Sequence, residues 1–286
     1  CLIMIPAFVV FSVIPFGNTE YELVLFGQTL TLTPFLADIN IALLFMLGVS
    51  SVGIYGIILG GWSSNNKFSL MGGLRSAAQM ISYEVPLGLS IVAILMLSGT
   101  ASLVGIVNAQ QEAGHWFLFW APFGVPLLWP QFIGLVLYFI AAVAETNRAP
   151  FDLPEAETEL VAGFHTEYSG MKFAFMFLAE YLNMILAGLI VSVLFLGGWM
   201  PITFGIPGLH DLFSNFLPFL GEAGAAITGF FWLALKVFGV LTVYLWLRAT
   251  FPRYRYDQLM SLGWKWLIPL GLVHVMVTAL LMLLRG

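Results

Sequence analysis

The chain has 286 residues, of which 60% are hydrophobic and only 9% are charged, and its formal net charge at pH 7 is −5. So few polar side chains cannot cover a water-facing surface, which excludes an ordinary water-soluble protein and indicates an integral membrane protein. The single cysteine, Cys1, excludes a disulfide framework or a cysteine-ligated cluster built from this chain alone. Any redox centre is therefore expected in a partner or a diffusible ligand.

Seven segments are apolar over about the 20 residues that a helix needs to cross a bilayer. They lie at residues 1–16, 39–61, 76–99, 129–145, 171–197, 225–249 and 263–284. Their length predicts an all-α, polytopic transmembrane helix bundle, because a membrane barrel would show alternating strands of ~10 residues. No internal repeat or soluble segment is evident, so a single integral membrane domain over residues 1–286 is predicted. The first segment lacks the basic flank and cleavage site of a signal peptide, and we expect it to be a truncated start.

The basic residues predict the orientation of these helices. Loops between the second and third, fourth and fifth, and sixth and seventh segments carry eight of the ten lysines and arginines: Lys67, Arg75, Arg148, Lys172, Arg248, Arg253, Arg255 and Lys265. Lys236 lies within a segment, and Arg285, at the outer terminus, is the only exception. The loops at residues 17–38, 100–128 and 198–224 contain neither residue type. The positive-inside rule therefore places the three basic loops together on the cytoplasmic or matrix side.

One of these basic-side loops, residues 145–170, is unusually acidic. Its sequence ETNRAPFDLPEAETELVAGFHTEYSG includes the carboxylates Glu145, Asp152, Glu155, Glu157, Glu159 and Glu167. One interpretation is a solvated loop in which Asp152 caps a short helix. However, Glu155 and Glu159 stand four residues apart and would repel each other on one helix face. The alternative is that some of these acids line a polar cavity, where desolvation and neighbouring charge favour proton exchange.

Charges inside the predicted spans support the second interpretation. Glu84 precedes Pro86 in the third segment, Glu180 lies one turn before Asn183 in the fifth, and Lys236 is in the middle of the sixth. An ionisable side chain at the centre of a membrane helix costs at least ~2.5 kcal/mol, so it usually faces the bundle interior or a hydrated path. A Lys236–Glu180 ion pair that only holds helices together is the competing interpretation.

Other functional patterns are weak. His115, His165, His210 and His274 have no metal-binding spacing, and no metal site is expected. The chain has no phosphate loop, dinucleotide fingerprint or nucleophile elbow. Catalysis by this chain alone is therefore not expected, and neither is a nucleic-acid partner.

Three long motifs carry a resemblance to a known family. They are GWSSNNKFSLMGGLRSAAQMISYEVPLG at residues 61–88, TNRAPFDLPEAETELVAGFHTEYSGMKF at 146–173, and LRATFPRYRYDQLM at 247–260. In this order, on one membrane face, they resemble the H/ND1 family of membrane subunits from respiratory complex I, the NADH-quinone oxidoreductase. That family has eight spanning helices, and the resemblance implies that this chain corresponds to helices two to eight.

The resemblance implies a subunit of a multi-subunit NADH:quinone oxidoreductase, with no complete active site in this chain. Quinone is then the substrate, and iron–sulfur clusters and FMN are expected in partner subunits. The expected partners are soluble quinone-site subunits and small membrane subunits that lead to antiporter-like subunits, in a bacterial inner membrane or an organellar energy-transducing membrane. Reduction of the quinone would change the charge beside the carboxylates and so drive proton translocation.

The resemblance also assigns individual residues. The expected proton-path and coupling residues are Glu84, Asp152, Glu155, Glu157, Glu159, Glu167, Glu180 and Lys236. The expected quinone-chamber residues are Arg148, Phe151, Arg248, Arg253 and Arg255. Three rivals are a membrane subunit of an energy-converting hydrogenase, a stand-alone ion antiporter and a purely structural anchor for soluble subunits. An antiporter should show repeat symmetry or broken helix pairs, and a structural anchor needs neither Glu84 nor Glu180.

Overall fold

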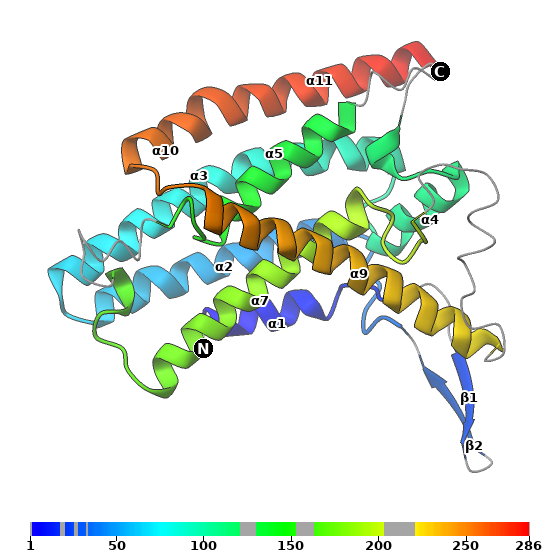
Figure 1. The fold of residues 1–286 in the computed structure, drawn as a ribbon, viewed down its shortest axis with the longest axis horizontal. Coiled ribbons are helices and arrows are strands. Elements are labelled where there is room, and N and C mark those ends of the chain that lie inside the picture. The colour runs from blue at the N-terminus through cyan, green and yellow to red at the C-terminus, as the bar shows by residue number, and fades with distance from the viewer. Residues whose placement is uncertain are drawn as a thin grey trace.

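The computed structural model describes residues 2–17, 21–25, 28–32, 34–120, 130–152, 163–202 and 221–285. These residues form a helical bundle, as predicted, with one small antiparallel hairpin (Figure 1). The main helices are α1 (Met4–Phe11), α2 (Ala42–Ser63), α3 (Lys67–Ser98), α4 (Leu103–Ala113), α5 (Pro130–Glu145), α7 (Met171–Leu194), α9 (Gly221–Thr250), α10 (Tyr256–Leu262) and α11 (Ile268–Arg285). Short helical turns are η1 (Phe117–Phe119), η3 (Gly163–His165) and η5 (Gly263–Leu267), and the hairpin strands are β1 (Tyr21–Leu25) and β2 (Gln28–Leu32).

Five of the seven predicted spans contain a helix long and apolar enough to cross a membrane. They are Ala42–Ser63, Lys67–Ser98, Met171–Leu194, Ile227–Thr250 and the continuous run Tyr256–Leu284. The fourth predicted span is the shorter apolar helix α5, with 16 residues. The first contains α1, with eight residues, which ends before Pro15 because a proline disfavours helical geometry in the residue before it.

Helix α3 begins nine residues before the predicted span. Asn66 caps it by accepting a hydrogen bond from the backbone N–H of Phe68 at 3.0 Å. The added first turns are polar and rich in glycine, so a search for apolar runs does not include them. Gly61 of α2 and Gly73 of α3 lie against each other's backbones, and this close approach brings the two helices together.

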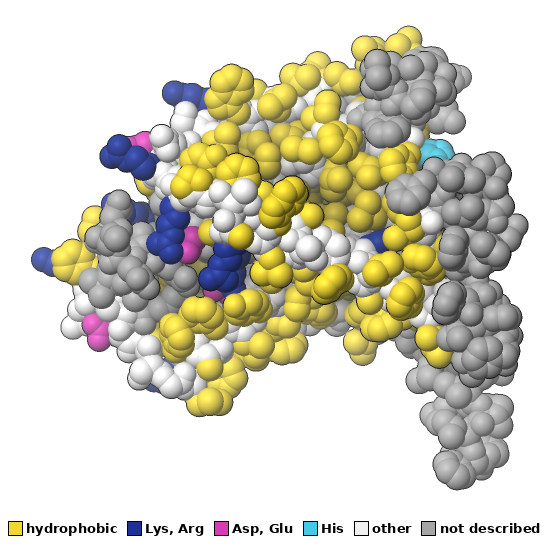
Figure 2. Space-filling model, viewed as in Figure 1, with side chains coloured by type: hydrophobic (Ala, Val, Ile, Leu, Met, Phe, Trp, Pro, Cys, Tyr) yellow, Lys and Arg dark blue, Asp and Glu magenta, His cyan; other side chains and the backbone are white. Residues whose placement is uncertain are grey.

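Helix α3 lies at the centre of the bundle, where it packs against α2, α5 and α11. Helix α7 packs against α1 and α9, and it also contacts α5. Figure 1 shows the α2–α3 connection, the start of α7 and the α9–α10 connection at one end, while the hairpin projects at the opposite end. Figure 2 shows most of the visible Lys, Arg, Asp and Glu side chains gathered at the first of these ends, while hydrophobic side chains cover much of the remaining described surface.

Candidate functional site

The chain turns back sharply after α5. Asn147 adopts a left-handed φ of 50°, a conformation that asparagine tolerates better than most residues. The backbone N–H of Arg148 donates to the carbonyl of Val143 at 3.3 Å, and the N–H of Phe151 donates to the carbonyl of Arg148 at 2.8 Å. We call residues 146–152, which these bonds fold into a compact unit, the post-α5 segment.

Two polar side chains of α3 hold the post-α5 segment. Gln79 is fully buried, and its amide nitrogen donates to the carbonyl oxygens of Ala144 at 2.8 Å and Phe151 at 2.9 Å. Three residues earlier on the same helix face, the hydroxyl of Ser76 accepts a hydrogen bond from the Asn147 amide at 3.1 Å. The position of the segment is therefore set directly by α3.

The ring of Phe151 is buried between two tyrosines. Its centroid lies 6.0 Å from that of Tyr83 on α3 and 5.6 Å from that of Tyr254, with which it is stacked. The Tyr83 hydroxyl donates to the carbonyl of Leu259 at 2.9 Å, and the Tyr254 N–H donates to the carbonyl of Pro150 at 3.1 Å. These contacts join the post-α5 segment to the basic stretch between α9 and α10.

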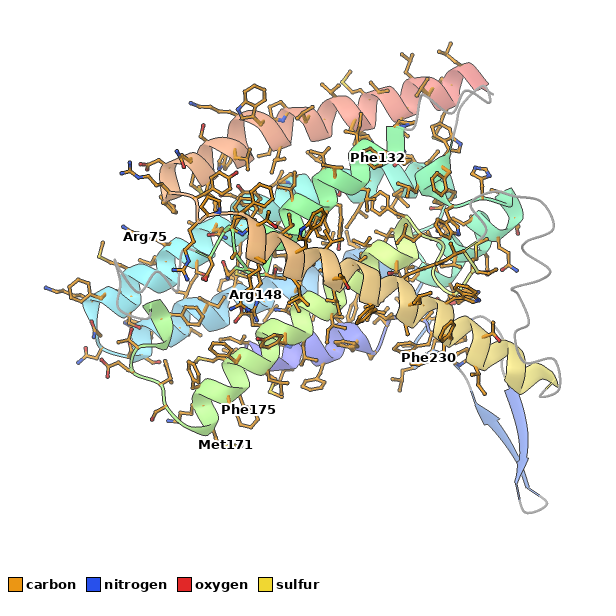
Figure 3. The ribbon with its side chains drawn as sticks, in the orientation of Figure 1. Arg75, Phe132, Arg148, Met171, Phe175 and Phe230 are labelled. Carbon is orange, nitrogen blue, oxygen red and sulfur yellow. The ribbon has the colours of Figure 1, made fainter. Side chains whose placement is uncertain are left out.

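Arg148 extends from the same segment in another direction, to α7 (Figure 3). Its Nε lies 2.9 Å from Oε1 of Glu180, and its guanidinium carbon lies 4.4 Å from the ring centroid of Tyr181. The Arg148 and Glu180 side chains are only 12% and 17% exposed. Because little water screens it, this ion pair is stronger than an exposed one and costly to break.

A small cavity lies beside this ion pair, and we call it the polar cavity because two carboxylates, Glu145 and Glu180, line it among apolar side chains. Its volume is about 40 Å³, and its lining residues are Ile3, Ile57, Met80, Glu145, Thr146, Asn147, Phe164, Met176, Glu180 and Asn183. By the volume that one water needs, it has room for about three waters. A more apolar cavity of about 80 Å³ shares Glu145, Thr146 and Asn183 with it and continues to Tyr138 and Leu43. Glu145 and Glu180 therefore face one water-sized space inside the bundle.

Glu84 lies on α3 outside the lining of these two cavities. Its side chain is partly buried. Glu145, which lines the polar cavity together with Glu180, is the last residue of α5, and α5 packs against the helix α3 that carries Glu84.

Lys236 does not pair with Glu180, which corrects the ion pair considered from the sequence. Its ammonium group instead donates to the carbonyl oxygens of Leu196, Gly198 and Met200 at 2.5, 2.9 and 2.6 Å, and it lies 4.7 Å from the ring of Trp116. The physical reason is position along α7: Glu180 lies 14 residues before Leu194, the last residue of the helix, so about 21 Å of helix rise separates it from the turn that Lys236 binds. Lys236 thus binds the turn that follows the C-terminal end of α7, where a positive charge is favourable.

The remaining predicted residues lie nearer the surface. Arg253 approaches the carboxylate of Asp152 at 3.4 Å, with its side chain 52% exposed. Arg248 and Arg255 are exposed, and Glu167 is exposed and accepts a hydrogen bond from Asn66 at 3.0 Å. Glu155, Glu157 and Glu159 lie outside the described residues. Within the described part of the chain, no group of three His, Cys, Asp or Glu side chains could hold a metal ion.

The sequence profile of a family described as NADH dehydrogenase matches residues 1–279. The chain belongs to this family. Among similar curated proteins is the second H-type subunit of the NADH-quinone oxidoreductase of Koribacter versatilis, 54% identical over 87% of this chain and 64% of that protein. The H-type subunit of the Frankia casuarinae enzyme is 50% identical over 96% of this chain and 54% of its own length. The first H-type subunit of the Geobacter sulfurreducens enzyme is 46% identical over 99% of this chain and 74% of its own length. The chain thus spans between about half and two thirds of the first two relatives.

In this member of the NADH dehydrogenase family, two residues of the candidate site, Glu145 and Gln79, are not among those expected from the sequence. Glu145 was considered only as one of the loop acids, although its place at the end of an apolar segment indicated that its carboxylate could face the bundle. Gln79 gave no signal, because a neutral side chain in a stretch with Ser and Ala is common at any helix interface. Asn183, noted as sharing a face with Glu180, does line the same cavity.

Proposed function

We propose that the chain is a membrane subunit of an NADH-quinone oxidoreductase, that it forms part of the quinone chamber, and that it couples quinone reduction to proton movement. The observation that carries this proposal is the post-α5 segment. Within four residues, Phe151 contacts the basic stretch at residues 251–255, while Arg148 pairs with Glu180 beside the polar cavity. A change of charge on one side of the segment would be felt on the other.

The proposed assembly follows the names of the relatives, which are subunits of a quinone oxidoreductase. Quinone is the substrate, and its electrons come from iron–sulfur clusters and FMN in partner subunits. The exposed Arg248, Arg253 and Arg255 offer a basic surface for the soluble partner subunits. Small membrane subunits that lead to antiporter-like subunits would contact the apolar flanks of the bundle, in a bacterial inner membrane.

The proposed coupling is electrostatic. Quinone takes up two electrons and two protons to become quinol, and electrons that arrive before protons add negative charge near Arg148. At an effective dielectric of about 20, a unit charge ~8 Å from a carboxylate changes its energy by about 2 kcal/mol. Such a charge would weaken the hold of Arg148 on Glu180, so proton uptake by Glu180 becomes more favourable and can pass to Glu145 through the polar cavity.

The other predicted acids keep a place in this proposal. Glu84 would extend the path from Glu145. Asp152, which pairs with Arg253, would lie at the quinone chamber. Glu155, Glu157, Glu159 and Glu167 would supply the acidic loop. The contacts of Lys236 favour a structural role over membership of the path.

Replacing the cavity acids tests the proposal. In the assembled complex, Glu180→Gln and Glu145→Gln should each lower both quinone reduction and proton pumping by about tenfold, equal to about 1.4 kcal/mol of barrier. Glu112→Gln, which neutralises an exposed acid on α4, is the matched control and should keep both rates. Wild-type rates in both cavity variants would remove this pair of carboxylates from the mechanism.

A further inference from the structure

Gln79 makes an unusual connection for a fully buried amide. The two hydrogens of its Nε2 go to carbonyl oxygens seven residues apart, those of Ala144 and Phe151. Ala144 directly precedes Glu145 of the polar cavity, and Phe151 directly precedes Asp152, which pairs with Arg253. One amide group therefore fixes the distance between the cavity side and the basic side of the post-α5 segment.

The other half of the same amide is unsatisfied. Gln79 Oε1 is buried and has no hydrogen-bond partner among the described residues. A buried acceptor without a partner lowers stability, so the two donated bonds have to offset that cost. A glutamine whose acceptor is unpaired is better explained by what its two donors hold in place than by stability alone.

We propose that Gln79 is a positioning residue for the quinone chamber. This inference rests on the proposed function. By holding both the end of α5 and the post-α5 segment against α3, Gln79 sets where Phe151 and Arg148 lie, and hence how well the chamber fits the quinone headgroup. The Ser76–Asn147 hydrogen bond and the Tyr83 and Tyr254 rings keep the segment attached without Gln79, but they do not fix the carbonyl of Phe151.

Gln110 provides a matched control in the same chain. It is also fully buried, its Nε2 donates to the carbonyl of Val193 at 2.9 Å, and its Oε1 accepts from the N–H of Phe117 at 3.1 Å. It lies on α4, towards the hairpin end of the bundle and away from the charged end (Figure 1). Loss of this amide should harm packing without touching the post-α5 segment.

The experiment compares Gln79→Met with Gln110→Met in the full complex, using a short-chain quinone and normalising to assembled enzyme. Gln79→Met should raise the KM for quinone about tenfold while kcat changes less than about threefold, because the lost bonds place the chamber wall rather than carry the chemistry. Hydrogen exchange at the Arg148 and Phe151 amides should become faster. Gln110→Met should lower the yield of assembled complex at an unchanged KM.

Phe151→Leu separates the two levels of the proposal. If Phe151→Leu raises the KM and Gln79→Met does not, the positioning role of Gln79 is wrong while the chamber assignment stands. If neither variant changes the KM, the chamber assignment fails as well. Unchanged exchange of the segment amides in Gln79→Met contradicts the anchoring role whatever the kinetics show. Should Gln79→Met not assemble, Gln79→Glu, which has at most one donor, gives the same test and the same KM criterion.

Discussion

At the residue scale, Lys236 shows what a charged residue in an apolar segment does and does not reveal. Its burial inside the bundle could be predicted, since an ammonium group avoids lipid. Its partners could not, because they are backbone carbonyl oxygens of residues 196, 198 and 200, and every residue type has such an oxygen. The sequence suggested Glu180 only because it carries the opposite charge.

Lys236→Met should therefore act on stability. The substitution leaves buried carbonyl oxygens without a donor, each costing about 1–3 kcal/mol, so the chain should be lost from the heated, detergent-solubilised complex at a clearly lower temperature. Thr242→Val on the same helix, where the hydroxyl bonds only to its own helix, is the control. Pumping per assembled complex should persist. Normal heat resistance combined with lost pumping would instead return Lys236 to the proton path.

The acids of the candidate site are easier to recognise in a sequence than the residues that hold them. Glu180 and Asn183 were placed on one helix face by their spacing, and both line the polar cavity. The pairing of Arg148 with Glu180 was not predicted, because it depends on the turn after α5, which a single sequence does not specify. Charge is visible in a sequence, whereas the fit of a turn against a neighbouring helix is a property of packing.

At the element scale, α2 and α3 are joined by glycines rather than by large apolar side chains. A Cβ added at Gly61 would lie 2.9 Å from the carbonyl oxygen of Ser69, and one added at Gly73 would lie 3.2 Å from that of Ile57. Membrane helices often use small residues in this way, because direct backbone contact gives van der Waals attraction that lipid cannot replace. The closely packed pair of helices α2 and α3 thus holds Gln79 and Tyr83 in fixed positions.

Gly61→Ala should separate these helices. Because the obstructing atom belongs to the backbone, it cannot rotate away, and we expect a loss of about 1–3 kcal/mol, measured as less assembled complex and a lower temperature of heat inactivation. Gly48→Ala on the same helix has nothing within 4 Å of the added atom and should be neutral or slightly stabilising. Equal behaviour of the two variants would contradict the close approach.

At the scale of the whole molecule, the distribution of charge is the feature that the sequence predicted best. Lysines and arginines in three separate loops predicted one shared end, and most of the visible charged side chains gather there (Figure 2). Helix lengths were less predictable, because apolar runs mark burial in lipid but not where a helix begins or ends. The hairpin of β1 and β2 was not predicted, since its residues lie within the loop predicted at residues 17–38.

Thiol labelling of intact cells and inverted vesicles checks the orientation. With Cys1→Ser as the background, a cysteine from Ser169→Cys should react only from the cytoplasmic side, because this exposed residue lies in a basic-side loop. Glu112→Cys, exposed on α4, should react only from the opposite side. Labelling of both positions from the same face would disprove the arrangement.

The length of α3 has a consequence for how a lipid-soluble substrate would reach the protein. Its 32 residues rise about 48 Å, which is roughly 18 Å more than the thickness of the hydrocarbon core of a bilayer. If the C-terminal end of α3 lies at the outer boundary of the hydrocarbon core, about twelve residues at its N-terminal end extend beyond the inner boundary. Gln79 then lies at the inner boundary. A lipid-soluble quinone, the proposed substrate, would have to move its headgroup out of the hydrocarbon core at this level while its tail stays in the bilayer.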